Sequence, residues 1–195
     1  VVALAEGEIA VASMKSARLV SVFDAQGKVV REFGDPTEIA ERSELNRFLN
    51  IGRLASDPAG HIYYAFSYLP EPTLRKYDRY GYAAFEIAAT TLDFQPTAQA
   101  ARREIRRLER GGTPSLKPIV TAVGVDPETE EIWVAVGGLL LHFDRDGTRH
   151  GTYRTFTPEG ARLEAVAILV ERHRLLLASD PLGIYDFSRP DRKPR

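Results

Sequence analysis

Acidic residues recur in short turn-like segments of the chain, and carboxylates are ligands that Ca²⁺ prefers. Asp24, Asp78 and Asp144 each follow an aromatic residue and precede a glycine by three positions. Residues 144–147 (Asp-Arg-Asp-Gly) also begin like an EF-hand loop, but the later ligands of that loop are absent. An aspartate at such a position can instead accept hydrogen bonds from the backbone N–H groups that follow it, while glycine adopts the positive φ that a tight turn requires. The pattern favours hairpin turns over a calcium site.

Histidine is the other residue type that could hold a metal, and the chain has four: His61, His142, His150 and His173. None belongs to an H-x-H or H-E-x-x-H pair. His142 and His150 flank one expected hairpin, so one interpretation is a two-ligand metal site, and the other is a pair of strand-end or exposed histidines. The absence of cysteine excludes thiolate and disulfide chemistry. We expect no catalytic set, no metal and no cofactor.

A basic segment offers a candidate contact with a partner. Five arginines lie between residues 102 and 110, and we single out Arg103, Arg106 and Arg107 as candidates for contact with an acidic partner or RNA. The alternative is a solvated helix face on which neighbouring glutamates pair with the arginines. Because the formal net charge is −1, nucleic acid is not the partner that we expect.

The densest aromatic stretch runs from Tyr63 to Phe85 and includes the loop 68–72 (Tyr-Leu-Pro-Glu-Pro). Packing in a core is one interpretation of these residues. The other is contact with a ligand or protein at the loop, through Tyr68 and Pro70.

The elements that must position these residues form an internal repeat. Each unit reads strand, turn, strand, loop, strand, Asp-Gly turn, strand, and Tyr185-Asp186 serves as a degenerate fourth copy of the last turn. An antiparallel four-stranded meander repeated every ~40–50 residues is typical of β-propeller blades. We therefore expect an all-β single domain over 1–195, a β-propeller or partial propeller of about four four-stranded blades. The blades should span approximately 1–34, 50–88, 118–157 and 162–188, followed by a basic, Pro-containing tail at 189–195.

Two insertions interrupt the repeat, and both have helical patterns. The first covers 36–49 with Thr37 as its expected N-cap. The second covers 97–110 with Thr97 as its N-cap, and places Ala98, Ala101, Ile105 and Leu108 on one stripe. We expect both helices to lie outside the blades.

Residues 8–34 resemble the NHL-type repeat of six-bladed, TolB-like β-propellers. The similarity lies in Glu-Ile-Ala-Val-Ala at 8–12, Arg-Leu-Val-Ser-Val-Phe-Asp-Ala-Gln-Gly-Lys at 18–28 and Phe-Gly at 33–34. The resemblance implies a fold rather than an activity, because its motifs are turn and packing residues. It also implies a periplasmic or extracellular location. A related class of lactonases holds Ca²⁺ with Asn and acidic residues on inner strands, whereas the inner strands expected here are nearly all apolar.

The count of four units departs from the six of the family that the chain resembles. The fourth unit also lacks its last strand, because 188–195 is basic and rich in proline. We interpret the chain as an incomplete propeller, with a smaller ring as the alternative. It opens on an apolar run without Met, which indicates either a trimmed N-terminus that once carried an export signal or an arbitrary chain boundary.

These observations predict a non-catalytic binding or scaffold module, completed by other blades or by a partner protein. Its expected partners are proteins, or copies of itself, that dock on exposed terminal blades. The alternative is a lactonase- or lyase-like, metal-dependent propeller enzyme with a site in the channel. No apolar run reaches the ~18 residues of a membrane span.

Overall fold

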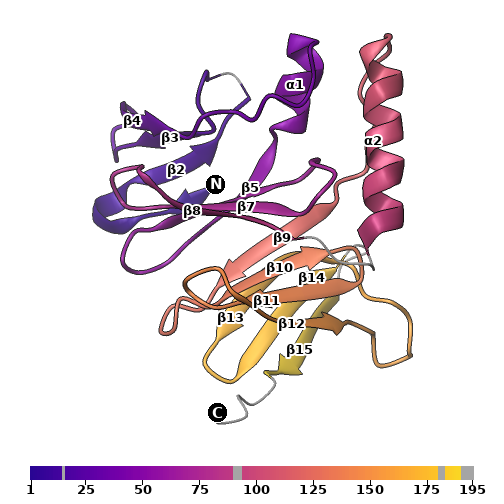
Figure 1. The fold of residues 1–195 in the computed structure, drawn as a ribbon. Helices are drawn as coiled ribbons and strands as arrows, with labels where there is room; N and C mark the ends of the chain where they lie inside the picture. The colour runs from indigo at the N-terminus through magenta and orange to yellow at the C-terminus, as the bar shows by residue number, and fades with distance from the viewer. Residues whose placement is uncertain (15, 90–93, 180–182, 190–195) are drawn as a thin grey trace. The chain divides into compact units, whose positions relative to one another are not determined.

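The computed structural model describes residues 1–14, 16–89, 94–179 and 183–189, and these form four antiparallel sheets in which consecutive strands pair (Figure 1). Three sheets have four strands and the last has three. The first sheet holds β1 (Val2–Ala3), β2 (Ile9–Ala12), β3 (Val20–Phe23) and β4 (Val29–Phe33). The second holds β5 (Gly52–Ser56), β6 (Ile62–Phe66), β7 (Thr73–Tyr77) and β8 (Ala83–Ala88). The third holds β9 (Val120–Val125), β10 (Ile132–Val136), β11 (Leu139–Phe143) and β12 (Arg149–Arg154), and the fourth holds β13 (Ala165–Glu171), β14 (Arg174–Ser179) and β15 (Gly183–Ser188).

This architecture confirms the expected fold class, a partial β-propeller with two short helical insertions. Neither helix in the described part of the chain has the length and apolarity that a membrane span needs. The chain divides into two compact units, Val1–Val120 and Thr121–Arg195. The expectation of one domain over 1–195 stays a prediction.

The first helix is shorter than expected, and Thr37 does not cap it. Helix α1 spans Ser43–Leu49. The segment before it is held in a non-helical form by two amides: Asn46 Oδ1 accepts from the N–H of Ile39 at 2.8 Å, and Asn50 Oδ1 accepts from the N–H of Thr37 at 2.8 Å. These tertiary bonds replace the intrahelical bonds that residues 37–40 would otherwise make.

The second helix, α2, spans Gln95–Glu109 and so begins earlier than expected. Thr97 lies inside it rather than at its cap, because Pro96 occupies the first turn, where its missing N–H costs nothing. The expected stripe is confirmed: Ala98, Ile105 and Leu108 are buried, and Ala101 is half-buried.

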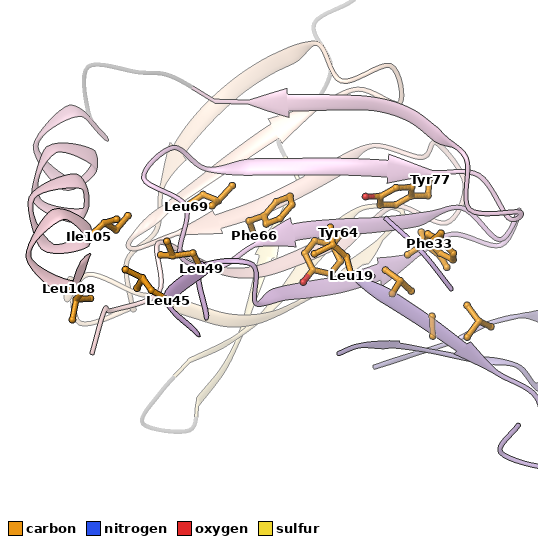
Figure 2. Close-up of a cluster of buried hydrophobic side chains, with 14 residues drawn as sticks. Leu19, Phe33, Leu45, Leu49, Tyr64, Phe66, Leu69, Tyr77, Ile105 and Leu108 are labelled. Atoms are coloured by element: carbon orange, nitrogen blue, oxygen red, sulfur yellow. The ribbon is translucent and has the colours of Figure 1, made fainter. Parts of the chain in front are cut away.

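Both helices contribute to the core of the first unit (Figure 2). Apolar side chains of the first two sheets and of the helices form one buried cluster, whose large members include Leu19, Phe33, Tyr64, Phe66, Tyr77, Leu45, Leu49, Ile105 and Leu108. Beyond this cluster, Glu109 Oε1 accepts from the N–H of Glu41 at 2.8 Å. The helices are therefore packed parts of the unit rather than loose appendages.

The aspartate turns have the chemistry that the sequence predicts. Asp24 Oδ1 accepts from the N–H of Gln26 at 3.0 Å and of Lys28 at 2.9 Å. The side chains of Asp78 and Asp144 likewise accept hydrogen bonds from the backbone N–H groups two and four residues ahead of them. The turn interpretation is confirmed at three of the repeats.

The expected fourth copy at Tyr185-Asp186 is wrong. Asp186 lies inside β15 and pairs with Leu176 of β14. In the other sheets the aromatic residue before the turn pairs with the first apolar residue of the second strand, as Phe143 does with Ile132. In the fourth sheet the residue with that pairing is Phe187, opposite Leu175. The strand register therefore places the repeat two residues later than the sequence letters indicate.

Candidate protein-binding surfaces

The residues singled out as partner contacts lie in the first unit, in different surroundings. Arg103 and Arg106 are exposed on α2. Arg107 is also exposed, but its Nε donates to Glu104 Oε2 at 2.8 Å, as the solvated-face interpretation predicts. Pro70 is buried. The ring of Tyr68 lies 4.4 Å from that of Phe48, as core packing predicts.

The first unit also contains a cavity of about 630 Å³, which none of these five residues lines. Its walls come from the β2–β3 connection, the segment before α1, α1 itself and the start of β5. Met14 and Ile39, two exposed apolar side chains, both line it. Charged groups of both signs, including Arg18, Glu38 and Arg47, also line it. This mixture does not define one class of ligand.

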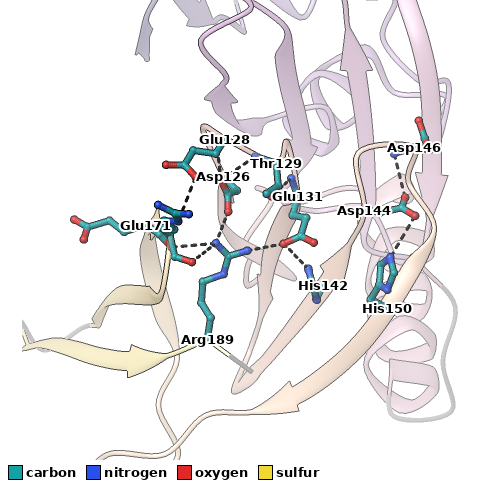
Figure 3. Close-up of polar contacts among 11 residues, drawn as sticks. Asp126, Glu128, Thr129, Glu131, His142, Asp144, Asp146, His150, Glu171 and Arg189 are labelled. Carbon is teal, nitrogen blue, oxygen red and sulfur yellow. Dashed lines mark hydrogen bonds and ion pairs between the residues drawn. The ribbon is translucent and has the colours of Figure 1, made fainter. Parts of the chain in front are cut away.

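The second unit contains a buried ionic cluster that the sequence did not indicate (Figure 3). Arg189, which follows β15, makes ion pairs with Asp126 and Glu131, whose side chains are 1% and 4% exposed. It also donates to the backbone oxygens of Glu171 at 3.0 Å and Arg172 at 3.2 Å. Burial raises the pKa of Asp126, but bonds from the backbone of Glu128 and Thr129 and from Arg189 outweigh it, so the pKa lies below its ordinary value. Arg189 thus fastens the end of the fourth sheet to the turn that precedes β10.

A signal for Arg189 does exist in the sequence once the strand is placed. Tyr185 and Phe187 pack against the core of the second unit, and Arg189 follows them with the period of two that one face of a strand requires. The tail residue therefore continues the buried face of β15. Its acidic partners could not be foreseen, because they lie about sixty residues earlier in the chain.

The histidine pair does not share a ligand position. The rings of His142 and His150 lie 5.5 Å apart. However, His142 Nε2 lies 3.5 Å from Glu131 Oε2, whereas His150 Nε2 lies 3.3 Å from Asp144 Oδ2 (Figure 3). Each imidazole is thus directed to a different carboxylate. His142 also stacks on Trp133, with ring centroids 4.1 Å apart and planes 7° from parallel.

His142 should make the second unit sensitive to acid. Burial lowers its pKa below the ordinary 6.5; His150 and Arg189 act in the same direction and Glu131 opposes them. The unfolded chain then binds more protons than the folded one, so the free energy of unfolding should fall as pH falls below about 6.5. We expect His142→Phe to reduce this fall between pH 7.5 and 5.5 in urea titrations, and the exposed His173→Gln to leave it unchanged. Equal acid sensitivity in all three proteins would contradict this assignment.

The fourth sheet has an apolar face that the other described residues of the second unit leave uncovered. Leu169 of β13 is 56% exposed and Ile184 of β15 is 79% exposed. Strand pairing places Leu169 beside Leu176 and Ile184 beside Ala178, so these side chains share one face. The opposite face, with Leu175 and Leu177, is buried in the core of the second unit. A sheet that carries apolar side chains on both faces normally has another element packed against each face.

The same position in the other sheets shows how unusual this exposure is. Val20, Leu74 and Leu140 each pair with an alanine of the second strand, as Ile184 does. Those three side chains are between 0% and 3% exposed. Ile184 therefore occupies a core position of the repeat at an uncovered site.

Solved structures with a similar fold are β-propeller proteins. Saccharomyces cerevisiae Sqt1 matches with a TM-score of 0.55 at 10% identity, covering 94% of this chain and 42% of that one. A chain of the mitotic checkpoint complex matches with a TM-score of 0.52 at 10% identity, covering 88% of this chain and 43% of that one. The β-propeller domain of Myceliophteria thermophila Cps50 (Swd1) matches with a TM-score of 0.44 at 11% identity, covering 70% of this chain and 35% of that one.

No family model matches the chain, and no curated protein matches its sequence. The chain spans between 35% and 43% of the length of these three solved chains. At such low identity the likeness concerns the fold alone. Together with the order of the strands, it shows that the chain has the fold of a partial β-propeller.

Proposed function

We propose that this chain is a protein-binding or scaffold module of NHL-like type, whose fourth sheet receives a further sheet from a partner protein or another copy. The observation that carries the proposal is the uncovered apolar face at Leu169 and Ile184. Blades of a propeller pack face to face, so an uncovered blade face is a surface suited to another sheet. Large exposed apolar patches on soluble proteins typically mark interaction sites.

The test places a photo-crosslinking amino acid at position 169 in the organism that produces the protein, with position 80 as the matched control. Tyr80 is 63% exposed in the turn between β7 and β8 of the first unit, so it is accessible but lies outside the fourth sheet. We expect a discrete protein adduct at position 169, absent at position 80 and lost when the neighbouring Leu176 is changed to Glu. Equal labelling at both positions, or none at position 169, would overturn the proposal.

The periplasmic or extracellular location is proposed on the resemblance alone. Fractionation of the producing cells, with a periplasmic and a cytoplasmic marker protein, tests it. Recovery of the chain with the cytoplasmic marker would reject this location.

A further inference from the structure

The fourth sheet lacks a strand that each of the other three sheets has. In those sheets the third strand, β3, β7 or β11, pairs on its outer side with a fourth, β4, β8 or β12. The corresponding strand β15 pairs with β14, and no described residue pairs with its other side. The edge of β15 is therefore open within the described part of the chain.

The alternation of the strand shows which backbone groups this edge presents. Arg189 donates its N–H to His173 O at 2.9 Å, which continues the β14–β15 ladder. Because bonded residues alternate along an antiparallel strand, Phe187 and Tyr185 also face β14. Ile184, Asp186 and Ser188 then turn their N–H and C=O groups toward the open edge, and all three residues are exposed. In the third sheet, Asp144 has the position of Ser188, and its N–H donates to Thr148 O at 2.9 Å.

This edge has few of the features that protect edge strands from pairing. Natural edge strands are commonly blunted by proline, lysine, bulges or short length. The six residues of β15, Gly-Ile-Tyr-Asp-Phe-Ser, contain neither proline nor lysine, and their register with β14 is continuous. Asp186 is the single charged side chain of the strand. The open edge of β15 can therefore pair with a further strand.

Two segments of the chain itself are poor candidates for this position. The N-terminal strand β1 pairs with β2 in the first sheet, where Val2 lies opposite Ala10. The six residues after Arg189, outside the described residues, read Pro-Asp-Arg-Lys-Pro-Arg. They include no large apolar residue, and their two prolines lack the N–H that a ladder requires.

The chain's own fourth strands indicate what an occupant of the edge should look like. The residue opposite the Ile184 position is Phe33 in the first sheet, Ile87 in the second and Tyr153 in the third. Each is a large apolar or aromatic side chain. The residue before it in the chain is polar: Glu32, Glu86 and Thr152. In β4, Arg31 is two residues before Phe33, at the position that would face Asp186.

We propose that the open edge of β15 binds an extended segment of a partner protein as an antiparallel fourth strand, by β-strand addition. The segment carries a basic, a polar and a large apolar residue in succession. The apolar residue covers Ile184, and the basic residue pairs with Asp186. Main-chain bonds to Ile184, Asp186 and Ser188 supply the affinity, and the two side-chain contacts fix the register. This inference rests on the proposed binding function and names the chemistry of the partner at the same sheet.

The probe for this edge is a synthetic peptide with the sequence of residues 26–35, which contains the Arg-Glu-Phe of β4. Added to the intact ¹⁵N-labelled chain, it should shift the amide signals of Ile184, Asp186 and Ser188 and slow their exchange with solvent at least tenfold. A matched peptide in which Phe33 is changed to Asp should bind at least tenfold more weakly. Two variants of Ser188 test whether the backbone of the edge binds the peptide. Ser188→Pro removes an N–H that faces the open edge and should abolish the shifts, whereas Ser188→Ala keeps this N–H and should preserve them.

The outcomes distinguish this inference from the proposed function. Leu176→Glu alters the face beside Leu169 and should remove crosslinking at position 169 while leaving the peptide shifts intact. Absence of peptide shifts at the three amides, or equal binding of the Asp-substituted peptide, overturns strand addition even if crosslinking at position 169 succeeds. Failure of crosslinking together with intact peptide shifts overturns the docked sheet and retains the edge site.

Discussion

Replacing Arg189 with alanine is expected to lower the free energy of unfolding of the second unit by about 3–5 kcal/mol. The guanidinium is the partner of two carboxylates, on Asp126 and Glu131, that are almost entirely buried. Removing the guanidinium takes the cationic partner away from two buried carboxylates, which costs more than the cluster's net contribution to stability. The chain has one tryptophan, Trp133, and it is buried in the core of the second unit. Urea titration followed by tryptophan fluorescence therefore reports on the unit that contains the cluster.

Arg174 provides the matched control for this substitution. It also makes two ion pairs, with Glu171 and Asp186, but all three side chains are at least 40% exposed. Exposed pairs contribute little, so Arg174→Ala should leave the urea midpoint nearly unchanged. Changing Asp126 to Asn and Glu131 to Gln together with Arg189→Met should recover much of the loss, because no buried charge is then unpaired. Equal effects of Arg189→Ala and Arg174→Ala would show that the cluster does not fasten the fourth sheet.

Proline substitutions at two adjacent residues of β15 should lower the free energy of unfolding by very different amounts. Tyr185 faces β14, opposite Leu177, so Tyr185→Pro removes a bond of the ladder and should cost about 2–3 kcal/mol more than Tyr185→Ala. Asp186 faces the open edge, where proline is tolerated, so Asp186→Pro should cost little more than Asp186→Ala. Subtracting the free-energy change of the alanine variant at the same position removes the contribution of the lost side chain.

The same urea titrations measure this contrast. If the proline at position 186 destabilised the unit as much as the proline at position 185, the N–H of Asp186 would have a bonding partner. The edge of β15 would then not be open, and the inference of strand addition would be wrong.

The parts of the fold that could be predicted from the sequence depend on local chemistry. Asp24, Asp78 and Asp144 bond to the backbone two and four residues ahead, so a short segment contains all the information that their turns need. The buried stripe of α2 likewise follows from spacing within one helix. These predictions are confirmed because no distant residue is required.

The errors arise where distant residues decide the structure. The start of α1 is moved by Asn46 and Asn50, whose amides bind the backbone of the segment before the helix. Asp186 matched the repeat by residue type, but pairing with β14 sets the register and selects Phe187 instead. The Arg189 cluster joins residues that are 63 and 58 positions apart, and nothing in either segment indicates the other.

The uncovered fourth sheet was predictable in outline only. The sequence indicated a unit without its last strand, and the strand order agrees for the described residues. Which side chains it leaves exposed depends on register, because a shift of one residue exchanges the two faces of a strand. Leu169 and Ile184 could therefore be assigned only from the strand pairing.

Hydrogen exchange of the β15 amides in the isolated chain tests most directly the claim that the fourth sheet is the open end of a partial propeller. The open edge predicts rapid exchange at Ile184, Asp186 and Ser188, alternating with protection at Tyr185 and Phe187. In the third sheet, where β12 covers β11, Leu140, Leu141 and His142 should all be protected. Protection of all five β15 amides in the isolated chain would contradict the account, because the edge would then already be paired.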